Sequence, residues 1–122
     1  MAKDKLLIVD DDVSFLDLAK TYFKERGIDA TAVENSMRAL SAMKTQGFKV
    51  VILDYQMPQT KGDDLIAILQ RVNPKARFII VTGFTEEHVE HKFKGLGYYA
   101  YFEKANLSWK KLEDAVVEAF KS

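Results

Sequence analysis

Five short apolar runs alternate along this chain with segments whose apolar residues recur at helical spacing, and this alternation constrains the fold more than any other feature. Strands alternating with helices are typical of an α/β fold, in which right-handed crossovers place helices on both faces of a parallel sheet. Five strands are too few for an eight-stranded barrel, so the pattern predicts a doubly wound five-stranded parallel sheet with five helices. The expected strands lie at 6–9, 28–32, 50–53, 78–81 and 98–102, and the expected helices at about 12–27, 35–47, 62–73, 86–94 and 106–121.

The central run, Val50-Val51-Ile52-Leu53, leads directly into the carboxylate of Asp54. A short, unbroken apolar run rich in β-branched residues is typical of a strand that is buried on both faces. In open α/β sheets, ligands bind outside the carboxyl ends of the strands. The run therefore predicts that Asp54 stands at the rim of the sheet and faces a binding site. Alternatively, Asp54 only begins a turn, because aspartate also favours turns.

Composition narrows the class of protein. The 122 residues fit one domain spanning 1–122, and 18 basic and 18 acidic residues give a formal net charge of zero. Zero net charge gives no indication of direct nucleic-acid binding, and no run approaches the ~20 apolar residues of a membrane span. The chain has no cysteine, which suits the cytoplasm, where we expect it to act. His88 and His91 are three residues apart on a polar segment, where a solvated surface pair is expected.

Chemically active side chains follow the four most apolar of the predicted strands. These residues are Asp10 and Asp11, Asp54, Thr82, and Lys104. Because the carboxyl ends of parallel strands share one rim, three carboxylates, a hydroxyl and an ammonium are expected to meet there. Two carboxylates ~4 Å apart repel by roughly 4 kcal/mol at an effective dielectric near 20, which a divalent cation would relieve. Oxygen ligands without cysteine or histidine favour Mg²⁺, whose open positions would accept phosphate oxygens.

The same set of residues indicates phosphoryl chemistry. A carboxylate is a competent nucleophile toward phosphorus, and Asp54 stands alone at the end of the central strand. Asp10 and Asp11 would hold the metal, while the metal and Lys104 would neutralise the charge that develops during transfer. The Thr82 hydroxyl would bond another phosphate oxygen.

This arrangement resembles the receiver domain of bacterial two-component response regulators. The resemblance covers essentially the whole chain and rests on Asp10-Asp11, on Asp54 followed by Met57-Pro58 and Gly62, on Thr82, and on Lys104. It implies a (βα)5 flavodoxin-like sheet with strand order 2-1-3-4-5. It also implies a signalling switch, not an enzyme, that takes a phosphoryl group on Asp54 from a sensor histidine kinase or phosphotransfer protein. Such a switch assists its own phosphorylation and dephosphorylation.

The resemblance assigns further roles. The backbone carbonyl of Gln56 would help Asp10, Asp11 and Asp54 to hold Mg²⁺. Tyr101, three residues before Lys104, matches an aromatic switch position that responds to movement of the threonine hydroxyl. A downstream protein would bind the face formed by the fourth helix, fifth strand and fifth helix.

The chain departs from the family pattern after Lys104, where Ala105 replaces the usual proline. A non-proline cis bond would cost roughly 2.5–4 kcal/mol, so we expect a trans bond and a reshaped loop. Gln56 and Phe84 match positions that tune the lifetime of the phosphoryl group in the family. We expect Phe84 to shield the acyl phosphate from water.

Two alternatives lie in other classes. Asp10-Asp11-Asp12-Val13-Ser14 also has the D-x-D-x-S pattern of haloacid-dehalogenase-type phosphatases, in which Asp10 would be the nucleophile and Asp12 the acid. The simpler interpretation of Asp12 is a helix cap. The second alternative is a degenerate receiver that only binds a partner. Trp109, at the start of the last helix, is expected to pack against the core, and contact with a partner is the alternative.

Overall fold

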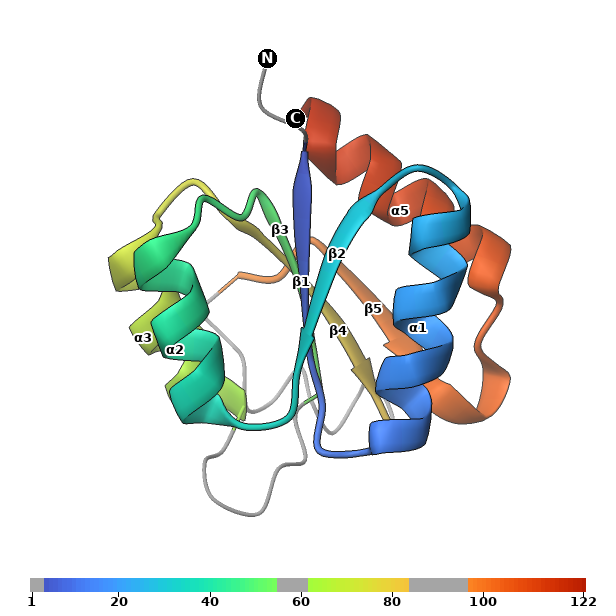
Figure 1. Cartoon of the computed structure of the whole chain (residues 1–122), viewed down its shortest axis with the longest axis horizontal. Coiled ribbons are helices and arrows are strands. Elements are labelled where there is room, and N and C mark those ends of the chain that lie inside the picture. The colour runs from blue at the N-terminus through green and yellow to red at the C-terminus, as the bar shows by residue number, and fades with distance from the viewer. Residues whose placement is uncertain (1–3, 55–61, 84–96) are drawn as a thin grey trace.

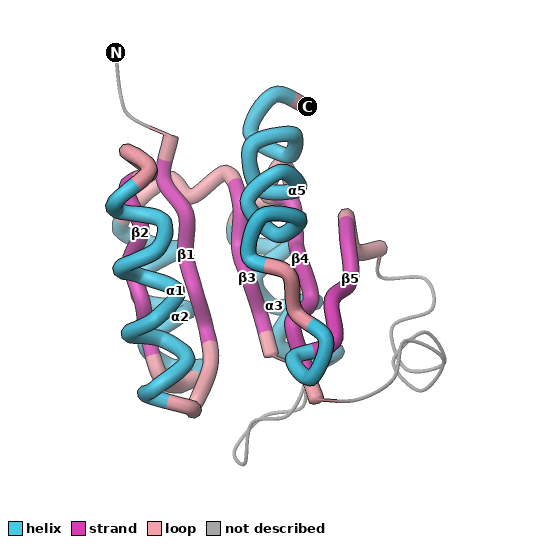
Figure 2. Tube along the Cα trace, turned by 90° about the vertical axis from the view of Figure 1, so that its right-hand side faces the viewer, coloured by secondary structure: helices cyan, strands magenta, loops and turns pink. Residues whose placement is uncertain are grey.

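A parallel sheet of five strands forms the centre of the computed structural model, which describes residues 4–54, 62–83 and 97–122. Its strand order is β2-β1-β3-β4-β5, which confirms the expected order and is visible from left to right in Figure 2. The strands are β1 (Lys5–Val9), β2 (Asp29–Val33), β3 (Val50–Leu53), β4 (Arg77–Thr82) and β5 (Ala100–Glu103).

Helices cover both faces of the sheet. The described residues form four α-helices, with α2 and α3 on one face and α1 and α5 on the other (Figure 1). The expected helix at about 86–94 lies outside the described residues. In the described part of the chain, none of the helices combines the length and the apolar character that crossing a bilayer requires. The helices are α1 (Val13–Glu25), α2 (Ser36–Thr45), α3 (Gly62–Val72) and α5 (Trp109–Lys121), and a short 3₁₀ turn spans Lys104–Asn106.

The core divides into two clusters because successive side chains of a strand point to opposite faces. In β1, Leu7 and Val9 pack toward α2 and α3, while Leu6 and Ile8 pack toward α1 and α5. Both sets are fully buried, as the unbroken apolar runs predict for a sheet covered on both faces. The strands are therefore rigid supports for the residues that follow them.

Capping residues fix where the helices begin. Asp12, Asn35 and Ser108 each accept a hydrogen bond from the backbone N–H three residues later. These contacts confirm the cap interpretation of Asp12 and show that Asn35 and Ser108 cap α2 and α5. After α1 the chain turns at Gly27, whose φ of +77° is a conformation that favours glycine.

The last strand differs from its predicted span. Pairing with β4 begins at Ala100, opposite Ile79, rather than at Tyr98, and it continues to Glu103. Gly97 adopts a φ of +71°, and Tyr99 N donates to Phe78 O at 2.7 Å, so the chain is still turning into the sheet over 97–99. The aromatic run therefore begins before the strand does.

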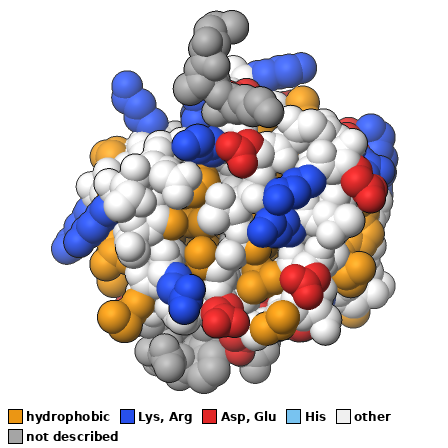
Figure 3. Space-filling view, in the orientation of Figure 1, with side chains coloured by type: hydrophobic (Ala, Val, Ile, Leu, Met, Phe, Trp, Pro, Cys, Tyr) orange, Lys and Arg blue, Asp and Glu red, His pale blue; other side chains and the backbone are white. Residues whose placement is uncertain are grey.

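Charged side chains of both signs share the surface. On the face drawn in Figure 3, Lys and Arg side chains lie among Asp and Glu side chains. This mixing agrees with the equal numbers of acidic and basic residues in the sequence.

Candidate functional site

The backbone of neighbouring strands holds the two central aspartates at the carboxyl rim of the sheet. Asp10 N donates to Val33 O at 3.2 Å, and Asp54 N donates to Val9 O at 3.0 Å. Asp10 thus follows β1 and Asp54 follows β3, as the sequence predicts. Both residues are almost completely buried, with 1% of Asp10 and 4% of Asp54 exposed.

Three carboxylates converge at this rim. Asp10, Asp11 and Asp54 each place one oxygen within 4.8 Å of the others, and Asp11 is exposed while the other two are buried. An all-oxygen set that combines two buried carboxylates with one open to solvent fits a hard cation such as Mg²⁺, which keeps several waters. The residues present therefore fit the cation that the sequence predicts.

Lys104 lies directly against this carboxylate cluster. Its Nζ is 2.7 Å from Asp10 Oδ2 and 3.1 Å from Asp54 Oδ2. Burial acts to lower the pKa of Lys104, but the neighbouring carboxylates of Asp10 and Asp54 outweigh it, and the pKa is raised above its usual value. The side chain therefore enters the site as a cation.

Burial governs the acidity of Asp10. Loss of solvent raises the pKa of this carboxyl from 3.8 to about 6, although Lys104 and the backbone N–H of Asp12 both favour the charged form. The Asp12 N–H donates to Asp10 Oδ1 at 2.9 Å. The ionised form of Asp10 therefore destabilises the folded protein.

Thr82 ends β4 at the same rim. The residue is completely buried, and within the described part of the chain its Oγ1 has no hydrogen-bond partner. A buried hydroxyl without a partner costs free energy, so it marks a place where an acceptor oxygen would be stabilised.

The remaining predicted residues fall into two groups. Tyr101 is half-buried in β5 and packs on the cluster that lies against α2 and α3, with its ring centroid 6.1 Å from that of Tyr98. Gln56 and Phe84 lie outside the described residues, as do His88 and His91. The expected trans bond between Lys104 and Ala105 is confirmed, since the described chain contains no cis peptide.

Asp12 is occupied as a helix cap. Its Oδ1 accepts from Phe15 N at 3.2 Å. This contact supports the capping interpretation over the role of a catalytic acid in a phosphatase.

One residue at the site, Phe15, was not predicted from the sequence to lie there. The Phe15 ring centroid lies 4.8 Å from Lys104 Nζ, and the ring stacks on Trp109 with a centroid distance of 5.6 Å. Helical spacing places Phe15 on the inner face of α1. Its position three residues after the Asp12 cap was the only indication that the ring lies near the rim.

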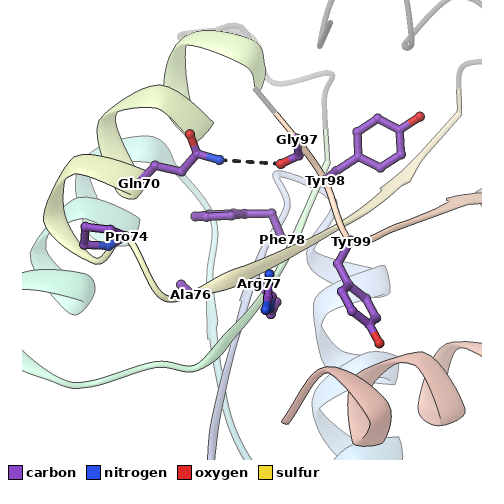
Figure 4. A pocket seen from close by; sticks show the side chains of 8 residues that line it. All are labelled: Gln70, Pro74, Ala76, Arg77, Phe78, Gly97, Tyr98 and Tyr99. Atoms are coloured by element: carbon purple, nitrogen blue, oxygen red, sulfur yellow. Dashed lines mark hydrogen bonds between the residues drawn. The ribbon is translucent and has the colours of Figure 1, made fainter. Parts of the chain in front are cut away.

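A hollow lies at the other end of β4 from the carboxyl rim, between the end of α3 and the segment that enters β5 (Figure 4). Its volume is about 410 Å³, and Gln70 Nε2 donates across it to Gly97 O at 3.5 Å. Phe78, Tyr98 and Tyr99 contribute to its wall, and no carboxylate lines it among the described residues. Among the described residues, this hollow therefore lacks a cluster of acids like the one at the carboxyl rim.

The proteins to which this chain is similar are response regulators and their receiver domains. The model of the response regulator receiver domain family matches residues 6–116. Response regulator SaeR of Staphylococcus aureus (strain USA300) is 32% identical over 83 residues, which cover 68% of this chain and 36% of that protein. The match thus takes in about a third of the relative's length.

Solved structures share the fold. The receiver domain of the Francisella response regulator 1452 matches with a TM-score of 0.87 and 28% identity over 98% of both chains. A CheY-like receiver domain protein from Methanospirillum hungatei JF-1 matches with a TM-score of 0.91 and 22% identity, covering 98% of this chain and 95% of that one. Because the family match extends over nearly the whole sequence, the chain belongs to the receiver domains of two-component response regulators, which are signalling regulators.

Proposed function

We propose that Asp54 accepts a phosphoryl group and that the chain, as a single receiver domain over 1–122, is a phosphorylation-dependent switch. The observation that carries this proposal is the position of Lys104 Nζ, which lies 3.1 Å from Asp54 Oδ2 and 2.7 Å from Asp10 Oδ2. At the end of the neighbouring strand, the buried Thr82 hydroxyl has no hydrogen-bond partner among the described residues. A nucleophile, a cation and a free hydrogen-bond donor at one rim are what phosphoryl transfer needs from a protein.

The transfer forms a bond between a carboxylate oxygen of Asp54 and phosphorus. The bond from phosphorus to the donor's leaving atom breaks, and its electron pair departs with the leaving group. Mg²⁺ bound by Asp10, Asp11 and Asp54, with the backbone carbonyl of Gln56, would neutralise charge on the phosphoryl oxygens. Lys104, whose Nζ lies 3.1 Å from Asp54 Oδ2, would pair with a phosphoryl oxygen.

Phosphorylation changes the balance between two states of the rim. A phosphoryl group adds charge and acceptor oxygens, so it favours the state in which Thr82 Oγ1 donates to it and Lys104 pairs with it. The Tyr101 ring is half-buried one strand away and would follow the movement of Thr82. The shift in population is limited to the difference in interaction energy between the two states.

Family membership supports the partners that we propose. A sensor histidine kinase or a phosphotransfer protein would supply the phosphoryl group in the cytoplasm. A downstream protein would bind the face that includes β5, α5 and the expected helix at 86–94. The chain would assist its own phosphorylation and dephosphorylation, with Gln56 and Phe84 setting the phosphoryl lifetime.

The proposal is tested by following intact mass during incubation with acetyl phosphate, with and without Mg²⁺. We expect one phosphoryl adduct that requires Mg²⁺ and is absent from Asp54→Asn. The matched control is Asp64→Asn, which changes an exposed aspartate in α3, and it should form the adduct as the wild type does. Failure of the wild type to form any adduct would favour a degenerate receiver that only binds a partner.

A further inference from the structure

We propose that Phe15 is a positioning residue for Lys104. Its aromatic face holds the ammonium group against the two buried carboxylates, and Trp109 fixes the ring in place. The inference rests on the proposed phosphorylation of Asp54, in which Lys104 pairs with the incoming phosphoryl group.

The contact has the geometry of a cation–π interaction. Lys104 Nζ lies 4.8 Å from the Phe15 centroid, within the ~6 Å over which a ring attracts a cation. Because Nζ also contacts Asp10 and Asp54, the ammonium group is in contact with one ring and two carboxylates. Such contacts strengthen when they are desolvated, and Phe15 is only 8% exposed.

The Phe15 ring is itself packed against other aromatic side chains. Trp109 stacks on it at 5.6 Å with 23° between the planes, and Tyr22 contacts Trp109 in turn at 5.2 Å. Tyr22 is tied to α5 by a 2.9 Å hydrogen bond from its hydroxyl to Glu113 Oε1. Aromatic side chains from α1 and α5 thus form one continuous stack that ends at Lys104.

The stack matters because the backbone that follows Lys104 gives its side chain little support, and the contacts to Asp10 and Asp54 hold only the ammonium end. Lys104 begins a single 3₁₀ turn whose next two residues, Ala105 and Asn106, are exposed. Ala105 has no ring to fix its φ, and a lysine side chain loses considerable rotamer freedom when it is held in one geometry. A rigid aromatic surface under the side chain would limit Nζ to positions between the carboxylates and the phosphoryl site.

A spectroscopic measurement tests the contact itself. In protein labelled with ¹³C at lysine Cε, the Lys104 signal, assigned with Lys104→Arg, should be displaced by the ring current of Phe15. Phe15→Leu should return the signal to the range of the other lysines, and Phe15→Tyr should keep the displacement. A Lys104 signal that does not change in Phe15→Leu would overturn the proposal.

The rate of adduct formation from acetyl phosphate at saturating Mg²⁺ tests the role. We expect Phe15→Leu to slow phosphorylation of Asp54 by about 2- to 30-fold, which is the range for the loss of one cation–π contact, and Phe15→Tyr to restore the rate. Phe23→Leu is the matched control, because Phe23 is another buried ring of α1, and its rate should equal that of the wild type. Thermal unfolding of each variant would confirm that it is folded at the assay temperature.

A double-mutant comparison separates positioning from general packing. If Phe15 acts through Lys104, Phe15→Leu should cause no further loss of rate in a Lys104→Met background. A loss of the same size in both backgrounds would overturn the proposal. Equal phosphorylation rates for Phe15→Leu and the wild type would overturn the role of Phe15 but not the proposed function. A wild type that takes no phosphoryl group would overturn both.

Discussion

Among the described residues, Asp10 has a raised pKa that bears directly on stability. In the folded protein its pKa is about 6, against 3.8 for an ordinary aspartate, so the folded state binds more protons between these values. The free energy of unfolding therefore falls as pH rises through this window. Above about pH 6, where Asp10 is ionised in both states, the loss of stability reaches its full size. The difference corresponds to on the order of 2–3 kcal/mol at neutral pH.

Asp10→Asn should therefore stabilise the protein. Without Mg²⁺ at pH 7.5, we expect the variant to gain about 1–3 kcal/mol, and the gain should shrink toward zero near pH 4. Urea unfolding at several pH values measures this difference. Asp11→Asn, at an exposed position, should gain much less, and a pH-independent gain in Asp10→Asn would contradict the explanation.

Thr82 also lowers the stability of the folded protein, because its buried hydroxyl has no hydrogen-bond partner among the described residues. Thr82→Val keeps the shape of the side chain and removes the hydroxyl, so the unphosphorylated protein should gain about 1 kcal/mol in unfolding free energy. Thr31→Val changes a half-buried hydroxyl in the edge strand β2 and is the matched control. A loss of stability in Thr82→Val would show that the hydroxyl is already satisfied before phosphorylation.

The sequence predicts the acids of the site better than their surroundings. Asp10, Asp54 and Thr82 each follow an unbroken apolar run, so their place at the rim depends only on strand direction. The contact between Phe15 and Lys104 joins residues 89 positions apart, and it depends on how α1 settles on the sheet. No local pattern encodes that packing, so the sequence did not predict that Phe15 lies at the site.

The start of α1 depends on Asp12, which caps the helix. Asp12→Ala removes the bond to Phe15 N and should cost about 1 kcal/mol, whereas Asp12→Asn retains a capping oxygen and should stay within about 0.5 kcal/mol of the wild type. Chemical unfolding compares the two variants. Because Asp12 is a cap, Asp12→Asn should also keep its phosphorylation rate, and abolition of that rate would favour the phosphatase alternative.

Boundaries of elements followed from local chemistry where a cap or glycine marks them. Asn35 caps α2 and Gly27 lies just after α1, close to the expected limits of these helices at 35 and 27. The predicted start of β5 was wrong by two residues. Tyr98 and Tyr99 have strong strand propensity, but the strand pairs with β4 only from Ala100 onward. Pairing with a neighbouring strand, rather than propensity, decided where that strand starts.

For the whole molecule, the alternation of apolar and helical segments was enough to predict a parallel sheet covered on both faces. The order β2-β1-β3-β4-β5 came from the family resemblance, because local patterns do not specify which strands become neighbours. One partial indication is the alternation of apolar and polar residues over 28–32, which is typical of a strand near the edge of a sheet. The sheet order is what brings the ends of β1 and β3 together and so creates the cluster of acids.

Cation binding should stabilise the whole fold, since a ligand that binds only the native state adds RT ln(1 + [L]/Kd) to its stability. We expect Mg²⁺ to raise the melting temperature of the wild type, and NaCl at matched ionic strength to have a smaller effect. Asp10→Asn and Asp11→Asn should reduce the Mg²⁺-dependent shift. An equal shift in all three proteins would place the cation elsewhere on the molecule.

The most direct test of the central claim is to identify the phosphorylated residue. Wild-type protein treated with acetyl phosphate and Mg²⁺ would be reduced with borohydride, which converts an aspartyl phosphate to homoserine, and then digested and sequenced by mass spectrometry. Homoserine at position 54 alone is the predicted result. Homoserine at position 10, or no conversion at any aspartate despite a phosphoryl adduct, would contradict Asp54 as the phosphoryl acceptor.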